Sequence, residues 1–143
     1  SSPEVREFVE ALQGELLEEG RPDQPVEDIL VGAMALEGAL SYLRRGLHQA
    51  VVTGGDRSEI ALAALEAGAS LLVLTGGIYP SVNVLTRAHE RQTAVLLVPY
   101  DTWSAVERMQ RVSRHLYPEE KEELAAAHET VMRYCAVDRI LGA

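Results

Sequence analysis

Two turns that combine paired glycines with hydroxyl side chains carry the clearest chemical signal in the sequence. They occupy residues 53–58 and 75–81, and each follows a short apolar run. Paired glycines let backbone N–H groups approach an anion, and the start of a following helix adds partial positive charge. We therefore predict a phosphate or carboxylate site at these turns. The residues that supply its amides, hydroxyls and guanidinium are Thr53, Gly54, Gly55, Arg57, Ser58, Thr75, Gly76 and Gly77.

A purely structural role for the same turns stays open. Glycine pairs after strands often serve only a tight turn into the next helix. Asp56 or Ser58 could cap the helix that follows the first turn, Ser81 could cap the next one, and Arg57 could pair with a carboxylate such as Asp101. No G-x-x-x-x-G-K-[ST] segment occurs, and no G-x-G-x-x-G follows a strand. The sequence therefore lacks the usual fingerprints of triphosphate and dinucleotide sites.

Residues that commonly perform catalysis do not group in this sequence. Cys135 falls on the apolar side of the last predicted helix, which favours a core role. Asp56 and Asp101 could form an acid/base pair across two loops. No two histidines have zinc-ligand spacing on one helix. We predict no catalytic residue and no metal site, with the aspartate pair kept as an active-site alternative. The histidines are His48, His89, His115 and His128.

Three aromatic residues, Tyr79, Tyr100 and Trp103, fall on or next to the turns that follow the predicted strands. Aromatic side chains with one polar end are common both at nucleobase sites and in subunit interfaces. We favour packing against a partner subunit, and base stacking stays open.

The charge balance excludes several classes of partner. Of 143 residues, 13 are Lys or Arg and 22 are Asp or Glu, which gives a formal net charge of −9. Such an acidic surface repels phosphate backbones and anionic membranes, so we expect no nucleic-acid and no membrane partner. The single cysteine excludes an intrachain disulfide framework. No apolar run is long enough for a membrane span and no leader precedes the first helix, so we expect a cytoplasmic protein.

The spacing of apolar residues predicts the helices and strands between which the two turns lie. Apolar residues at helical spacing predict a helix over residues 3–12, with Ser2 as its N-cap. Short, wholly apolar runs alternate with amphipathic segments in the middle of the chain, which indicates a mostly parallel sheet covered on both faces. We predict an α/β fold, a three-layer α/β/α sandwich, with a helix added at the C-terminal end. The expected strands are residues 26–32, 50–52, 70–74 and 93–98, and the expected helices are residues 34–45, 59–67, 82–91, 103–115 and 119–134.

Three segments follow from this pattern. We expect an N-terminal helix and linker over residues 1–25, an α/β core over residues 26–115 and a helical extension over residues 116–143. Because the chain starts on a helix without an initiator methionine, we expect it to be part of a longer polypeptide.

Several ordered motifs resemble the DRTGG domain. They are Asp28-Ile-Leu-Val-Gly-Ala-Met, Val52-Thr-Gly-Gly-Asp-Arg-Ser, Leu72-Val-Leu-Thr-Gly-Gly-Ile-Tyr-Pro and Val98-Pro-Tyr-Asp-Thr-Trp. Ser58 stands where the family motif has threonine. The segment from Tyr117 onward resembles the extension of phosphotransacetylase-like proteins, which join a BioD-like ATPase domain, of the dethiobiotin or cobyrinic acid synthase type, to a DRTGG domain.

The resemblance implies a fold similar to the N-terminal domain of HPr kinase/phosphatase, usually dimeric, with the chemistry residing in neighbouring domains. We accordingly expect a non-catalytic regulatory module that forms a homodimer and senses a small anionic metabolite or nucleotide; no cofactor is predicted. A part in acyl-phosphate or nucleotide chemistry and a structural dimer spacer are the alternatives. The resemblance places the ligand contacts at Gly55, Asp56, Arg57, Ser58, Thr75, Gly76, Gly77, Asp101 and Thr102.

Overall fold

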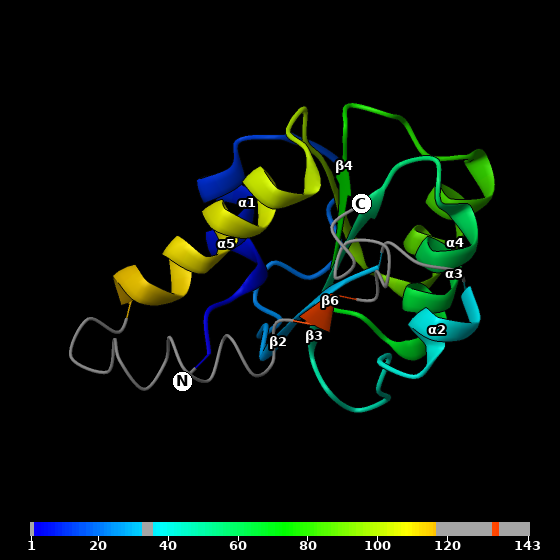
Figure 1. Cartoon of the computed structure of the whole chain (residues 1–143), viewed down its shortest axis with the longest axis horizontal. Helices are drawn as coiled ribbons and strands as arrows, with labels where there is room; N and C mark the ends of the chain where they lie inside the picture. The colour runs from blue at the N-terminus through cyan, green and yellow to red at the C-terminus, as the bar shows by residue number, and fades with distance from the viewer. Residues whose placement is uncertain (1, 33–35, 117–132, 135–143) are drawn as a thin grey trace.

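A sheet runs through the middle of the molecule in this computed structural model, which describes residues 2–32, 36–116 and 133–134. Within these residues the strand order is β1-β5-β4-β3-β2-β6. Strands β2 to β6 run parallel, whereas β1 pairs antiparallel with β5 (Figure 1). The strands are β1 (Glu15–Glu18), β2 (Asp28–Val31), β3 (Gln49–Gly54), β4 (Leu71–Thr75), β5 (Ala94–Leu97) and β6 (Arg133–Tyr134).

Helices cover both faces of this sheet. α1 (Val5–Leu12) and α5 (Thr102–Leu116) lie on one face, and α2 (Leu36–Leu40), α3 (Ser58–Ala67) and α4 (Val82–Arg91) lie on the other (Figure 1). The predicted α/β/α sandwich with a mostly parallel sheet is therefore confirmed.

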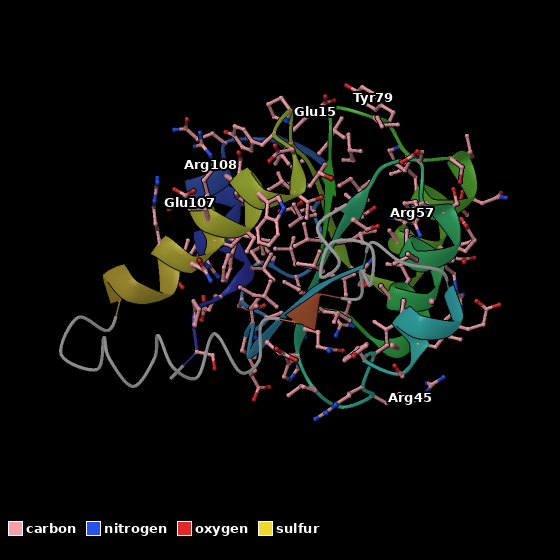
Figure 2. The ribbon with its side chains drawn as sticks, viewed as in Figure 1. Glu15, Arg45, Arg57, Tyr79, Glu107 and Arg108 are labelled. Atoms are coloured by element: carbon pink, nitrogen blue, oxygen red, sulfur yellow. The ribbon has the colours of Figure 1, made fainter. Side chains whose placement is uncertain are left out.

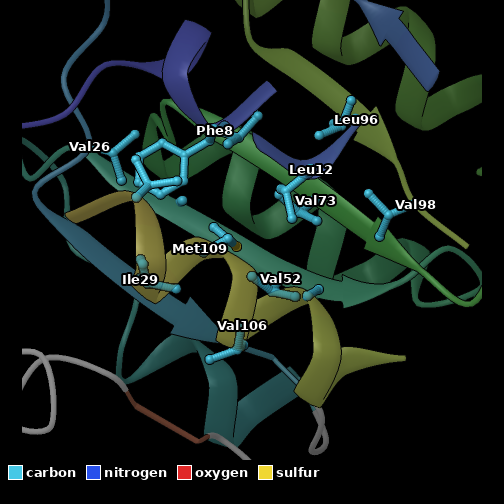
Figure 3. Packing of buried hydrophobic residues seen from close by; sticks show 14 of the residues in the cluster. Phe8, Leu12, Val26, Ile29, Val52, Val73, Leu96, Val98, Val106 and Met109 are labelled. Carbon is cyan, nitrogen blue, oxygen red and sulfur yellow. The ribbon is translucent and has the colours of Figure 1, made fainter. Parts of the chain in front are cut away.

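Alternate residues along the strands pack into two separate hydrophobic cores, one on each face of the sheet. In β3, Val52 joins Phe8 of α1 and Met109 of α5 on one face (Figure 3). The neighbouring Val51 packs on the other face with Ile60 of α3. Every residue of β2, β4 and β5 is buried, as expected for parallel strands that are covered on both sides. This rigid centre fixes where the loops at each end of the sheet lie.

The structure adds a strand and shortens a helix relative to the sequence prediction. β1 lies within the segment that was expected to be helix and linker. The helix predicted over residues 34–45 is limited to Leu36–Leu40 among the described residues. The Gln49 side chain accepts from Arg44 N–H and donates to the Tyr42 carbonyl, at 2.9 and 3.0 Å. These backbone groups are thereby taken out of helical hydrogen bonding.

The two ends of the chain also differ from the prediction. Glu4, not Ser2, is the N-cap of α1, and its N–H donates to Glu7 Oε2 at 2.7 Å. Of the helix expected over residues 119–134, residues 119–132 lie outside the described residues, as do His128 and Cys135. Arg133 and Tyr134 form β6 beside β2, so no helix extends to residue 134.

Candidate functional site

The predicted site residues gather at one end of the sheet, where β3, β4 and β5 finish. We call this end the carboxyl rim; its three turns are the first turn (residues 54–57), the second turn (residues 76–81) and the third turn (residues 98–101). The first and second turns are in close contact, because a Cβ atom on Gly55 would lie 1.6 Å from the Ile78 carbonyl oxygen. Only glycine fits at this position.

The glycine pair of the second turn is used inside the protein. Gly76 and Gly77 have φ angles of +78° and +67°, in the left-handed region that favours glycine. Gly76 N–H donates to the Tyr100 carbonyl at 2.7 Å, and Gly77 N–H donates to the Val98 carbonyl at 2.9 Å. These two amides hold the second turn against the third, so in this conformation they are not aimed at a ligand.

The first turn makes fewer backbone hydrogen bonds of this kind; its Gly55 is buried and its Asp56 is exposed. Arg57 N–H closes the turn by donating to the Gly54 carbonyl at 3.0 Å. Among the described residues, Gly55 and Asp56 donate no backbone hydrogen bond of this kind. Arg57 is the N-cap of α3 and makes no side-chain capping bond, so the predicted cap by Asp56 or Ser58 is wrong. The N–H groups at the start of α3 therefore point toward the rim without a side-chain acceptor from the cap.

The hydroxyls predicted as ligand donors have internal partners. Thr53 is buried, and its Oγ1 donates to the Gly32 carbonyl at 2.6 Å. Thr75 is also buried, and its Oγ1 lies 3.3 Å from Thr102 Oγ1. These bonds connect β3 to the end of β2, and β4 to the start of α5. The two hydroxyls therefore stabilise the rim and are already engaged inside the protein.

Two helix caps complete the rim. The carboxylate of Asp101 accepts from Ser104 N–H at 2.8 Å at the start of α5. Ser81 accepts from Val84 N–H at 3.4 Å, which confirms the predicted cap of α4. Asp101 thus has a capping role that the acid/base interpretation did not include, while Asp56 is exposed on the first turn.

Tyr100 and Tyr79 have different partners in the structure. The Tyr100 hydroxyl donates to the Leu12 carbonyl at 2.8 Å, and the Arg108 guanidinium lies 3.9 Å from its ring centroid. Tyr100 therefore packs between α1 and α5. Tyr79 is 59% exposed and donates to Glu15, at the same end of the molecule in Figure 2; this hydrogen bond raises the pKa of Tyr79. Trp103 is 52% exposed.

Metal-ligating side chains do not converge in the part of the chain that the structure describes. No group of three His, Cys, Asp or Glu residues there could hold a metal ion. Two histidines make local contacts with carboxylates: His48 Nε2 lies 3.9 Å from Glu27, and His89 Nδ1 lies 3.0 Å from Glu18.

The family model for the DRTGG domain matches residues 7–112 of this sequence. This chain belongs to the DRTGG domain family. The match covers the rim with its three turns and also includes β1 and most of α1, which the motifs recognised in the sequence did not include. In this DRTGG chain, Arg57 and the start of α3 therefore lie within the matched region.

Two relatives of known function contain a similar segment. The chain is 31% identical over 119 residues to a phosphate acetyltransferase of Nitratidesulfovibrio vulgaris, a match of 76% of this chain and 16% of that protein. It is 31% identical over 77 residues to a cobalt-dependent inorganic pyrophosphatase of Clostridium perfringens, a match of 54% of this chain and 14% of that protein. The chain thus spans about one sixth or less of each relative.

A solved structure is similar in fold as well as in sequence. It holds the CBS and DRTGG domains of the regulatory region of the Clostridium perfringens pyrophosphatase, complexed with the activator diadenosine tetraphosphate. The TM-score is 0.61 and the identity 25%, with 73% of this chain and 44% of that chain covered.

No helix within the described ranges is long and apolar enough to cross a membrane.

Proposed function

We propose that this chain is a non-catalytic regulatory module of a larger cytoplasmic protein and senses a nucleotide or another small anionic metabolite. The observation that carries the proposal is the similarity to a regulatory region solved with a nucleotide activator. The phosphate acetyltransferase relative supports a phosphotransacetylase-like parent, with a BioD-like ATPase domain as its further expected part. The α/β core over residues 26–115, together with α1 and β1 that pack into it, would be the sensing part and residues 116–143 an extension.

The carboxyl rim is the proposed ligand site. The Asp56 amide of the first turn and the N–H groups at the start of α3 would supply the donors, and α3 adds partial positive charge at that end. Arg57 is partly exposed at the same place, beside α3 in Figure 2. A phosphate group at this point would meet amide and guanidinium donors together. Stacking of a nucleobase on Trp103 or Tyr79 is the alternative to packing of these exposed rings against a second copy.

A ligand panel tests this proposal. Thermal unfolding of the chain is measured with diadenosine tetraphosphate, ATP, coenzyme A and acetyl phosphate, each at a range of concentrations. A ligand at 100 times its Kd stabilises the native state by about 2.7 kcal/mol, which is a clear rise in Tm. Arg57→Ala should remove most of the rise that diadenosine tetraphosphate, ATP or coenzyme A produces. Arg111→Ala is the matched control, since Arg111 is an exposed arginine on α5 that pairs with Glu107.

Two outcomes, one from this panel and one from an activity assay with acetyl phosphate and ATP, would contradict the sensor proposal. If no ligand in the panel changes the Tm, the structural spacer becomes the better interpretation. If the chain turns over acetyl phosphate or ATP and Arg57→Ala abolishes the turnover, the rim is part of an active site.

We also propose that two copies associate through the carboxyl rim. Its exposed apolar side chains are Ile78, Tyr79, Val82 and Trp103, with exposed fractions from 44% to 76%. Burying these side chains against a second copy removes apolar surface from water, the main driving force of association. Sedimentation should show a dimer that Trp103→Glu weakens. Leu40→Glu, which changes a similarly exposed residue of α2, should leave the dimer intact; a monomeric wild type would refute the proposal.

A further inference from the structure

The amino rim, the end of the sheet where β3, β4 and β5 begin, holds a polar cavity that the proposed function does not use. Its volume is about 440 Å³. Arg21, His48, Ser70, Arg91 and Thr93 are among its lining residues. Ser70 and Thr93 immediately precede β4 and β5, and the carboxyl ends of α3 and α4 border the same cavity. The whole length of the strands separates it from the three turns of the carboxyl rim.

Positive charge gathers here although the chain as a whole is strongly acidic. Two arginines, Arg21 and Arg91, line the cavity against one carboxylate, Glu90; His48, which also lines it, lies 3.9 Å from a further carboxylate, Glu27. The chain's net charge is −9, so a lining with more cationic than anionic groups runs against the average of the surface. Arg45 lies at this end of the molecule too, away from Tyr79 and Glu15 (Figure 2).

Arg91 is held in place before any ligand arrives. Its Nε donates to the Leu65 carbonyl and its Nη2 donates to the Glu66 carbonyl, both at 3.1 Å. These bonds fix the guanidinium and occupy carbonyls at the carboxyl end of α3, where a helix carries partial negative charge. The comparable carbonyl of α4, at Ala88, accepts from Thr93 N–H at 3.0 Å. The helix ends that border the cavity therefore repel an anion less than bare ends would.

The remaining lining suits a small ligand that carries no base. Ser70 is buried, and its Oγ lies 3.3 Å from His48 Nδ1, so the hydroxyl and the ring are positioned by each other. Thr93 is also buried. Among the residues that the structure describes, no Phe, Tyr or Trp lines the cavity, so these residues offer a nucleobase no aromatic face to stack on. Arginines and hydroxyls together are the usual partners of a phosphate group.

We infer that this cavity is a second anion site, which binds a small phosphate-bearing anion between Arg21 and Arg91, with Ser70 and His48 as additional hydrogen-bonding groups. It is distinct from the nucleotide site proposed at the carboxyl rim. Such a site gives the module a second input, the level of free phosphate or of a small organic phosphate.

Calorimetric titration of the full chain with inorganic phosphate, pyrophosphate and acetyl phosphate, in 150 mM NaCl, tests the inference. At least one of them should bind, and the three arms separate free phosphate from a phosphate on a larger carrier. Arg21→Gln should weaken that binding at least tenfold, since Arg21 is exposed and its loss leaves the core intact. Ser70→Ala should weaken it by a smaller factor. Arg111→Gln, which removes an exposed arginine from α5, should leave the Kd unchanged.

The outcome is separable from that of the nucleotide panel. Arg57→Ala should leave phosphate binding at the amino rim unchanged, whatever it does to nucleotides. Absence of binding by all three anions, or an Arg21→Gln variant with the wild-type Kd, would overturn the second site. Phosphate binding that Arg57→Ala abolishes would also overturn it, because the anion would then be at the other end of the sheet.

Discussion

Replacing Gly55 with alanine should separate the first and second turns at the carboxyl rim. The added Cβ would lie 1.6 Å from the Ile78 carbonyl oxygen, whereas ordinary contact begins at 3.4 Å. The two turns must therefore move apart by about 1.8 Å. The second turn cannot give way freely, because Gly76 and Gly77 are hydrogen-bonded to the third turn at 2.7 and 2.9 Å.

The cost follows from what the movement breaks. Each of those hydrogen bonds contributes about 0.5–1.5 kcal/mol, and forcing an atom into a packed contact costs about 1–3 kcal/mol. We expect Gly55→Ala to lower the free energy of unfolding by about 3 kcal/mol, and the Tm by roughly 10 °C for a chain of this size. Urea and thermal unfolding, followed by circular dichroism, measure both quantities.

Gly68→Ala is the matched control. Gly68 ends α3 with a φ of +86°, and an added Cβ there would meet nothing within 4 Å. Its cost should be limited to about 1 kcal/mol for a left-handed alanine. If Gly55→Ala is no more destabilised than Gly68→Ala, the two turns do not pack as described, and a single rim built from them is wrong.

Three further changes test other contacts. Tyr100→Phe removes the hydrogen bond to the Leu12 carbonyl and should cost about 1 kcal/mol in urea unfolding; a neutral effect would contradict that bond. Thr53→Val removes the hydroxyl that donates to the carbonyl after β2 and should cost about 1–3 kcal/mol, because a buried acceptor loses its donor; Thr53→Ser, which keeps the hydroxyl, should cost less. The Arg87 hydrogen bond, with Arg91 and Arg45 nearby, holds the pKa of Glu66 below its usual 4.5, so this stabilisation is present at neutral pH and is lost as the pH falls below 4.5. The stability difference between wild type and Arg87→Gln should accordingly shrink between pH 7 and pH 3; a constant difference would refute the ion pair as its source.

The layered core could be predicted from sequence because its signals are local. Uninterrupted apolar runs identify β2 to β5, and Gly68 and Ser81 mark helix ends and starts that the structure confirms. The approach of the two Thr-Gly-Gly turns also follows from local pattern, since parallel strands all finish at one end of the sheet.

The rest depends on contacts between distant parts of the chain. β1 is four residues long between Gly14 and Gly20, which read as helix breakers in the sequence. In the fold both glycines lie against the backbone of β5, where a Cβ would come within 2.3 Å and 2.1 Å of main-chain atoms. Because glycine has no side chain, Gly14 and Gly20 allow β1 to pair with β5. The sequence around β1 does not indicate a strand partner that lies about 80 residues away.

The hydrogen bonds of the Gly76 and Gly77 amides could not be predicted either, because their partners are also distant in the sequence. The acceptors of Gly76 and Gly77 are carbonyls of the third turn, more than 20 residues further along the chain. The direction of the Tyr100 side chain, toward α1 and not toward the other aromatic residues, is likewise set by a carbonyl near the N-terminus.

β1, one of the two edge strands of the described sheet, has an irregular register. In β1 the pairing with β5 shifts between Leu16 and Glu18, and acidic side chains stand at both ends of the strand. A shifted register and acidic side chains on an edge strand make a poor template for adding another strand. Self-association of this module should therefore stop at a closed pair and not grow edge to edge into fibrils, even when many copies are brought close together.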